Sequence, residues 1–370
     1  MSDAADSDTY ALKAADLPEI AAPQVAYRPP MPKILKPRIG VIGTGGISGS
    51  HLAAYRDAGW EVTALWNRTA AKAEARAAEF CPGARVEGNW QMIVSNPDID
   101  VVDVALRPEH RVEIITAALK AGKHVLSQKP FVTDLDTGMD LVKLAQDRGV
   151  KLAVNQNGRW APHFAFMREA ARAGLIGQVL SVHLAVHWTH GWTAGTPFDE
   201  IEDLILYDFG VHWFDFVSSI VGDRAEAVFA SATRGAGQAN KVPLLAQAMV
   251  RLDGGQASLV FDGGVPHGPR DTTFVGGTAG SLMSDGPDLS SQKVTMTTPD
   301  GIAHPDLEGQ WFNDGFKGTM GELLCAIEDD REPSNGAAEN LRSLALVFAA
   351  VRSRITGKEV EIGAARRLES

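Results

Sequence analysis

Cysteine, basic clusters and long apolar runs are all scarce in this chain of 370 residues. Two cysteines, Cys81 and Cys325, are too few for a disulfide framework, so we expect reduced thiols. No apolar run approaches the roughly 20 residues that span a bilayer, which predicts a protein without a membrane segment. A formal net charge of −11 and the lack of a basic cluster argue against nucleic acid or an anionic membrane surface as a partner.

The N-terminal residues are acidic and contain no export signal, which together with the cysteine usage predicts a cytoplasmic protein. Residues 1–36 are rich in Ala, Pro and Asp and cannot form much of a core, so we expect a flexible arm. An arm that docks on a partner subunit is the alternative. The remaining length exceeds what one hydrophobic core usually serves, which predicts two domains, residues 37–157 and 158–370.

The first of these domains alternates strand and helix patterns. The expected strands are Ile39–Ile42, Val62–Trp66, Val101–Leu106, His124–Ser127 and Lys151–Val154. The expected helices are residues 48–58, Thr69–Phe80, Arg111–Ala121 and Leu135–Asp147. Strands separated by helices of 10–15 residues indicate parallel βαβ units, so we predict a doubly wound α/β sheet of the Rossmann type.

The second domain has short alternating strands joined by tight turns such as Asp253-Gly254-Gly255. We expect an α/β domain with a large, mostly antiparallel sheet whose helices cover one face only. The expected strands are Gln178–Trp188, Ala227–Thr233, Ala246–Leu252, Gln256–Phe261, Thr272–Val275, Gly280–Met283, Lys293–Thr297, Ile302–His304 and Glu359–Ile362. The expected helices are Phe164–Ala173, Gly315–Ile327 and Ala337–Thr356. Because a monomer rarely tolerates a large open apolar face, we predict a homodimer or homotetramer.

The strongest functional signal is a glycine-rich loop between the first strand and the first helix. Gly43 permits a tight turn, Gly45 leaves room for phosphates, and Ser48 is small enough for close packing of helix on strand. With the neighbouring Gly46 and Ile47, this loop brings backbone N–H groups to a pyrophosphate at a helix N-terminus. The strand before it and the helix after it predict dinucleotide binding.

The end of the second strand bears on the choice of dinucleotide. A carboxylate there normally bonds the adenosine ribose and repels a 2′-phosphate, but this chain has Asn67 followed by Arg68. The missing negative charge slightly favours NADP(H) over NAD(H), so the cofactor is written NAD(P). The alternative is that Arg68 stacks on adenine, which suits NAD equally well.

Two further motifs carry groups suited to acid–base chemistry. Lys129 follows the fifth strand, where a nicotinamide would lie, although a Lys-Pro at a strand end is usually a solvated turn. Asp208 and His212 lie four residues apart, on one side of the first turn of an expected helix. A carboxylate beside an imidazole can take a proton from a secondary alcohol. The alternative is a helix cap followed by an ordinary polar residue.

Together these motifs resemble the glucose–fructose oxidoreductase/inositol dehydrogenase family, often written Gfo/Idh/MocA. The resemblance covers most of residues 37–363 and rests on Gly43-x-Gly45, Gln128-Lys129-Pro130 and Asp208-x-Gly210-x-His212-x-x-Asp215. Family members carry glutamate where this chain has Gln128, and often Thr-Pro where it has Arg107-Pro108. Gln128 can still bond the cofactor ribose without a charge, and Pro108 joins the expected cofactor contacts.

The resemblance implies a Rossmann domain followed by a domain whose open sheet forms oligomer contacts. It also implies Lys129, Asp208 and His212 as the catalytic trio that oxidises a sugar or cyclitol hydroxyl.

One region lies outside these shared motifs. Trp188 and Trp192 offer flat apolar faces suited to the C–H side of a sugar ring, although buried core tryptophan is the alternative. With His190 and Arg159 they form our candidate substrate set. His183, His187 and His190 could approach a metal, but strand geometry spaces the first two too widely, so we predict no metal.

The sequence therefore predicts an oxidoreductase that transfers a hydride between NAD(P) and a ring hydroxyl of a sugar, glycoside or cyclitol. The first alternative is an NAD-dependent glycosidase or lyase that acts by transient oxidation and elimination. The second is a dinucleotide-binding sensor without catalysis, which would more plausibly lack one residue of the trio.

Overall fold

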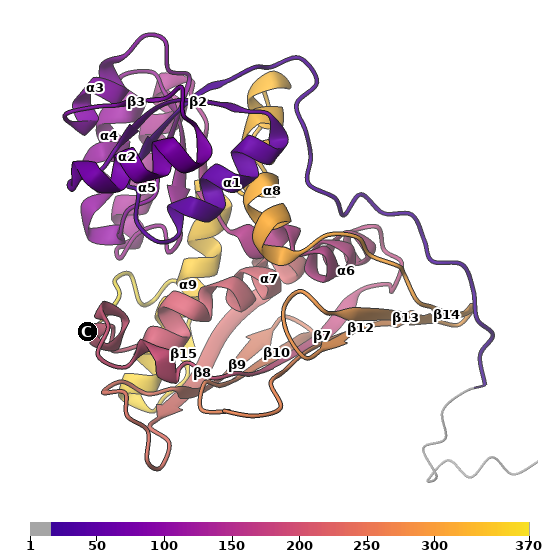
Figure 1. The fold of residues 1–370 in the computed structure, drawn as a ribbon. Coiled ribbons are helices and arrows are strands. Elements are labelled where there is room, and N and C mark those ends of the chain that lie inside the picture. The colour runs from indigo at the N-terminus through magenta and orange to yellow at the C-terminus, as the bar shows by residue number, and fades with distance from the viewer. Residues whose placement is uncertain (1–15, 370) are drawn as a thin grey trace, which may run out of the picture.

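A computed structural model describes residues 16–369, and Figure 1 shows two sheets with a layer of helices between them. The first sheet is parallel with strand order β3-β2-β1-β4-β5-β6. Its strands are β1 Arg38–Ile42, β2 Glu61–Trp66, β3 Arg85–Val86, β4 Val101–Val104, β5 His124–Gln128 and β6 Leu152–Asn155. Its helices are α1 Ser48–Ala58, α2 Ala70–Phe80, α3 Trp90–Ser95, α4 Val112–Lys120 and α5 Leu135–Arg148. The predicted doubly wound sheet is confirmed.

Local sequence explains where these elements begin and end. The Asp134 side chain accepts a hydrogen bond from the Thr137 backbone N–H at 3.0 Å and caps the start of α5. The helix ends at Gly149, whose φ of 63° is left-handed and favours glycine. The short elements β3 and α3 are absent from our sequence prediction, because a two-residue strand has no period and α3 is held by its Asn89 cap.

The second sheet has nine strands in the order β14-β13-β12-β11-β7-β10-β9-β8-β15. All neighbours are antiparallel except β7 and β10, so the sheet is mostly antiparallel as predicted. The strands are β7 Val179–His187, β8 Ala225–Thr233, β9 Leu245–Leu252, β10 Gly255–Asp262, β11 Arg270–Gly277, β12 Ser281–Gly286, β13 Lys293–Thr298, β14 Gly301–Ala303 and β15 Val360–Glu361. The helices are α6 Pro162–Arg172, α7 Val211–Val221, α8 Trp311–Glu328 and α9 Ala337–Thr356.

Helices cover only one face of this second sheet. In Figure 1, α6, α7 and α9 lie between the two sheets, and no helix of residues 16–369 lies on the opposite face. Helix α8 packs against α1 of the first sheet, where Phe316 and Met320 share a buried cluster with Ile39 and Leu52. Late residues of the chain thus complete the core beside the first sheet, and the division of the chain at 157/158 remains our prediction.

The N-terminal arm is described from residue 16 onward, and the earlier residues of that prediction lie outside the described part. This segment runs in extended form from the far end of the second sheet towards β1 (Figure 1). The Ile20 N–H donates to the Ile302 carbonyl at 2.8 Å, and the Glu328 carboxylate accepts backbone N–H groups of residues 33–35. Residues 16–36 therefore follow the body of the chain through specific hydrogen bonds. Among the described helices, none combines the length and apolar character needed to cross a membrane.

Candidate active site

The glycine-rich loop leaves β1 and turns past the end of β4. Gly43 has a φ of 102°, and a Cβ there would lie 2.7 Å from the Ala105 carbonyl oxygen, so only glycine fits. Added Cβ atoms at Gly45 and Gly46 would meet nothing within 4 Å. The loop is therefore closed on its inner side and open on its outer side, where a pyrophosphate would lie.

The backbone just before α1 supplies donors to this open side. No side chain caps the N-cap residue Ile47, and the N–H groups of residues 48–50 donate to the carbonyls of residues 45–47 at 3.0–3.4 Å. The N–H groups of residues 45–47 make no hydrogen bond within the described residues and are left for an external acceptor. No acidic residue occupies the first turn of the helix. Ser48 is buried and its hydroxyl donates to the Gly45 carbonyl at 2.7 Å, which fixes the loop. An open cradle at an uncapped helix start fits the phosphates of a dinucleotide.

Asn67 connects the end of β2 to this loop. Its Oδ1 accepts the Thr44 N–H at 3.1 Å, and its Nδ2 donates to the Thr69 carbonyl at 3.1 Å. The neighbouring Arg68 is exposed. Asn67 is thereby oriented by the protein, and Arg68 is the cationic group beside it.

Lys129 follows β5 and is held by Asp208. Its ammonium Nζ donates to the Asp208 backbone carbonyl at 2.7 Å and lies 3.4 Å from carboxylate Oδ2. Both side chains are mostly buried, at 13% and 15% exposed. The carboxyl end of a parallel strand is where doubly wound sheets bind ligands, so this ion pair faces the expected position of a reacting group. Pro108 begins a short 3₁₀ turn, Pro108–His110, that follows the neighbouring strand β4.

Arg111 braces the backbone around Lys129. Its buried guanidinium donates to the Lys129 carbonyl at 3.3 Å and to the Ser127 hydroxyl at 3.4 Å. Burial lowers its pKa to about 10, so it remains a cation at neutral pH. Our sequence analysis misses this residue because it is an ordinary helix-start arginine until the fold places it under β5.

His212 lies on α7 with its Nδ1 atom buried and without a hydrogen-bond partner among the described residues. The ring meets Trp311 edge-on at 5.5 Å. Burial, and then the positive charge of Lys129, lower the pKa of His212 well below its usual range. The imidazole is therefore neutral and able to accept a proton at physiological pH.

The expected helical turn that joins Asp208 to His212 is wrong. Asp208 belongs to a π-helical turn, Leu204–Phe209, and α7 begins only at Val211. The Gly210 N–H donates to the Ile205 carbonyl at 2.7 Å, five residues back. Asp208 consequently pairs with Lys129 and makes no hydrogen bond to His212 within the described residues.

Gln128, the last residue of β5, is held from inside by Asn155 of β6. Asn155 Nδ2 donates to Gln128 Oε1 at 2.8 Å and lies 2.9 Å from His51 Nε2. His51 Nδ1 in turn lies 2.7 Å from the Asp103 carboxylate, and Thr319 of α8 donates to Asn155 Oδ1 at 2.8 Å. Because Gln128 and these four partners come from five separate elements, no local pattern in the sequence identifies the network.

Arg159 does not belong with the candidate substrate residues. Its guanidinium donates to the Asp215 carboxylate at 2.7 and 2.8 Å and to the Ser334 carbonyl, and its side chain is 4% exposed. Its donors are thus directed to the protein, and the ion pair connects the turn before α6 to α7. The burial of Arg159 corrects the prediction that it contacts substrate. The spacing of residues in the sequence does not reveal this burial.

The other candidate substrate residues gather next to Asp208. Phe209, the following residue, packs against His190 at 4.3 Å and Trp192 at 6.3 Å between ring centroids. Trp192 is 58% exposed, whereas Trp188 packs on Trp213 at 5.7 Å. Burial lowers the pKa of His190 to about 4, so this ring is neutral. The result is an aromatic wall with one exposed indole.

The histidines considered as metal ligands contact different partners and do not converge on one point. His183 Nδ1 lies 2.7 Å from the Ser258 hydroxyl, and His187 lies 4.0 Å from the Asp262 carboxylate. Among residues 16–369 no group of three or more His, Cys, Asp or Glu side chains is arranged to hold a metal ion.

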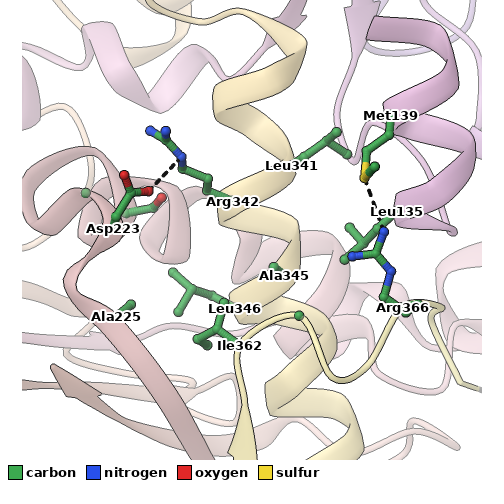
Figure 2. A pocket seen from close by; sticks show the side chains of 13 residues that line it. Leu135, Met139, Asp223, Ala225, Leu341, Arg342, Ala345, Leu346, Ile362 and Arg366 are labelled. Atoms are coloured by element: carbon green, nitrogen blue, oxygen red, sulfur yellow. Dashed lines mark hydrogen bonds and ion pairs between the residues drawn. The ribbon is translucent and has the colours of Figure 1, made fainter. Parts of the chain in front are cut away.

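A pocket of about 260 Å³ between α5, α9 and β8 contains none of the predicted site residues. Figure 2 shows an apolar floor that includes Leu341 and Leu346, with Arg342 turned towards Asp223 and Arg366 towards Met139. Arg342 forms an ion pair with Asp223 at 3.0 Å, and Arg366 pairs with Asp136. This pocket is therefore separate from the candidate active site, whose residues lie at the carboxyl ends of β1, β4 and β5 and on the π-helical turn and α7.

A parallel sheet with an open phosphate loop, next to a Lys–Asp pair and a neutral histidine, defines a dinucleotide-dependent oxidoreductase. Comparison with known proteins supplies the family. The model described as "Oxidoreductase family, NAD-binding Rossmann fold" matches residues 37–156, and the GFO/IDH/MocA C-terminal domain matches residues 164–283. The chain belongs to the Gfo/Idh/MocA family of NAD(P)-dependent oxidoreductases.

Its relatives include a 1,5-anhydro-D-fructose reductase from Ensifer adhaerens, 30% identical over 337 residues that cover 88% of this chain and 98% of the relative. An inositol 2-dehydrogenase from Rhizobium meliloti is 26% identical over 335 residues, 88% of this chain and 99% of the relative.

Among solved structures, an Agrobacterium radiobacter oxidoreductase in complex with NAD⁺, L-tartaric acid and magnesium has a TM-score of 0.79 at 22% identity, covering 89% of this chain and 99% of that one. A levoglucosan dehydrogenase in complex with NADH and levoglucosan has a TM-score of 0.75 at 20% identity, covering 88% and 99%. At these identities the structural likeness shows the fold.

Proposed function

We propose that this protein catalyses the reversible oxidation of a ring hydroxyl of a sugar, glycoside or cyclitol with NAD(P). The observation that carries this proposal is the Lys129–Asp208 ion pair beside the neutral His212, at the carboxyl end of β5. Relatives named as an anhydrofructose reductase, an inositol dehydrogenase and an apiose dehydrogenase support the substrate class.

The side chains divide the chemistry between them. When bound, the nicotinamide supplies the hydride acceptor or donor. The neutral His212 accepts the proton of the substrate hydroxyl, and the Lys129 ammonium stabilises the negative charge that develops on its oxygen. Asp208 holds Lys129 in place through its backbone carbonyl and its carboxylate.

We also propose that the aromatic wall of Trp188, His190 and Trp192 contacts the substrate. It adjoins Asp208 through Phe209, and the exposed indole of Trp192 offers an apolar face of the kind that packs on sugar C–H groups. Neutral His190 adds a hydrogen-bonding group without a charge.

For the dinucleotide we propose a preference for NADP(H) over NAD(H). Asn67 places no negative charge near a 2′-phosphate, and the exposed Arg68 offers a positive one. Replacing Asn67 by Asp should shift the preference towards NAD(H). Titration of wild type and of Asn67→Asp with each dinucleotide measures the dissociation constants that decide this. A wild-type protein that strongly prefers NAD(H) would show that the missing carboxylate carries no selectivity.

We propose that copies of this chain assemble through the uncovered face of the second sheet. Phe229, Met249, Phe274 and Met283 are 40–50% exposed and lie in one register row that runs from β8 to β12. Ser258 and His183 complete the centre of this row. Two copies of the chain would bury this apolar face against each other. This supports a homodimer, or a homotetramer built from two such dimers.

The substrate class is tested by a panel of free sugars, glycosides and cyclitols with each dinucleotide. Absorbance of the reduced nicotinamide reports turnover, and product analysis reports whether a glycosidic bond survives. We expect a ketone or lactone product with the rest of the substrate intact. Release of an aglycone without net reduction of the dinucleotide would favour the elimination mechanism instead.

A further inference from the structure

The imidazole of His212 is held by packing, not by a hydrogen bond. Its Nδ1 atom is buried and has no hydrogen-bond partner among residues 16–369. The Gly158 backbone lies against this atom, because a Cβ added to Gly158 would be 3.5 Å from Nδ1. The indole of Trp311 meets the imidazole at 89° with 5.5 Å between the ring centroids. The orientation of His212 therefore depends on what holds Trp311.

Trp311, the first residue of α8, is fixed by a hydrogen bond of its own. Its Nε1 donates to the Asn157 side-chain oxygen Oδ1 at 2.7 Å, and both residues are buried. Gly315 of α8 lets the 3₁₀ turn Asn157–Trp160 approach closely, because a Cβ at Gly315 would lie 2.5 Å from the Asn157 carbonyl oxygen. A Cβ at Gly158 would lie 2.9 Å from Trp311 Cζ2, so the indole packs on bare backbone. One hydrogen bond and two close approaches thus set the indole beside His212.

The titratable groups on the elements around His212 are paired, bonded to backbone or neutral. They are the ion pairs Lys129–Asp208 and Arg159–Asp215, the Asp314 carboxylate that accepts the Gln310 N–H, and His163, whose pKa burial lowers to about 3. Burial is the larger cause of the lowered pKa of His212, and the charge of Lys129 is the other. A residue that buries the imidazole therefore influences the pH at which it takes up a proton.

We propose that Trp311 is a positioning residue for His212: bonded to Asn157, its indole fixes the imidazole and keeps water from its buried side. Nε2 is then the ring nitrogen that meets the substrate hydroxyl. The inference rests on the proposed function, because it takes His212 as the base. It adds that α8, through a residue that does not itself touch the substrate, sets both the place and the strength of that base.

The variant Trp311→Leu tests the proposal with two readouts that a loss of stability alone would not move. Water reaches the imidazole in this variant, so His212 should titrate about one pH unit higher than in wild type. Nuclear magnetic resonance of isotope-labelled histidine measures this, and His212→Asn assigns the signal. The acid limb of kcat/KM should move upward with it, while kcat falls on the order of tenfold and KM stays within about twofold.

Trp60→Leu is the matched control. Trp60 is also a buried tryptophan, but it belongs to the cluster beside the first sheet and packs on Tyr55. Its replacement should lower thermal stability as Trp311→Leu does and leave the titration of His212 unchanged.

Gly158→Ala is a milder variant that keeps the indole. The added Cβ would displace Trp311 and press on His212 Nδ1 without opening the ring to water. It should lower kcat on the order of tenfold without raising the pH at which His212 titrates.

The proposal is overturned if Trp311→Leu folds and His212 titrates as in wild type, or if Trp60→Leu shifts that titration as far. If Trp311→Leu does not fold, Gly158→Ala decides, and an unchanged kcat in that variant overturns the proposal. The titration of His212 needs no turnover. A wild type that turns over no sugar, glycoside or cyclitol would therefore refute the proposed function, while the titration still tests the role of Trp311.

Discussion

His212 shows how burial changes the behaviour expected of an isolated residue. Its sequence position predicts a base with an ordinary histidine pKa, so that oxidation would rise with pH through the range near 6.5. In the structure, burial and Lys129 lower that pKa well below the ordinary value. The proton-accepting form is therefore already present at pH 6.5.

We expect kcat/KM for oxidation to stay level from about pH 6.5 to neutrality and to fall only in more acid solution, because the imidazole becomes protonated only there. Replacing His212 by Asn should lower kcat/KM by roughly 10²–10⁴ and remove the acid limb. A pH–rate profile of both proteins measures this. If wild type shows an acid limb centred above pH 6.5 and the variant does not, the lowered pKa of His212 is contradicted. If the variant keeps the wild-type rate, His212 is not the base.

At this scale the sequence predicts the position of a candidate residue in the fold where the chain itself places that residue. The phosphate loop, Asn67 and Lys129 lie at strand ends that periodicity alone locates. Arg159 is wrong as a substrate residue because its ion pair with Asp215 forms only when distant segments meet. Asn155 and Arg111 are missed for the same reason.

The π-helical turn Leu204–Phe209 is the element that positions Asp208. A Cβ at Gly210 would lie 2.6 Å from the Ile205 carbonyl oxygen and 2.8 Å from that of Leu206. These are backbone atoms that cannot move aside, so the turn depends on glycine.

Gly210→Ala should destabilise the protein by about 1–3 kcal/mol and also lower kcat, since opening the turn moves Asp208 away from Lys129. Urea unfolding and steady-state kinetics report the two effects. Gly88→Ala is the matched control, because a Cβ at Gly88 meets nothing within 4 Å. Equal stability of the two variants would show that the turn tolerates a side chain.

Most helices and strands are predicted within a few residues because their periods and glycine stops are local. The π turn is not, since a sequence with helix propensity on both sides of Gly210 favours a continuous α-helix. The π turn brings Asp208 into contact with Lys129, 79 residues away in the chain, and a local sequence pattern does not reveal that contact.

At the scale of the whole molecule, the second sheet has one face that no helix of the described residues covers, and we propose that a second copy of the chain covers it. Light scattering at micromolar concentration should show a dimer or tetramer for wild type. The double change Met249→Glu and Phe274→Glu should yield a smaller species, because it places charges in the centre of the apolar row. Met92→Glu is the matched control on α3, since Met92 is similarly exposed at 47%. A monomeric wild type would contradict the assembly proposal.

The central claim is that the Lys129–Asp208–His212 site performs hydride chemistry on a hydroxyl or ketone. Its most direct test is the turnover of Lys129→Met on whichever sugar or cyclitol wild type accepts, read from nicotinamide absorbance beside the dissociation constant of the dinucleotide. The account predicts a loss in kcat of roughly 10²–10⁴ with dinucleotide affinity nearly unchanged. Near-normal kcat in Lys129→Met would contradict it.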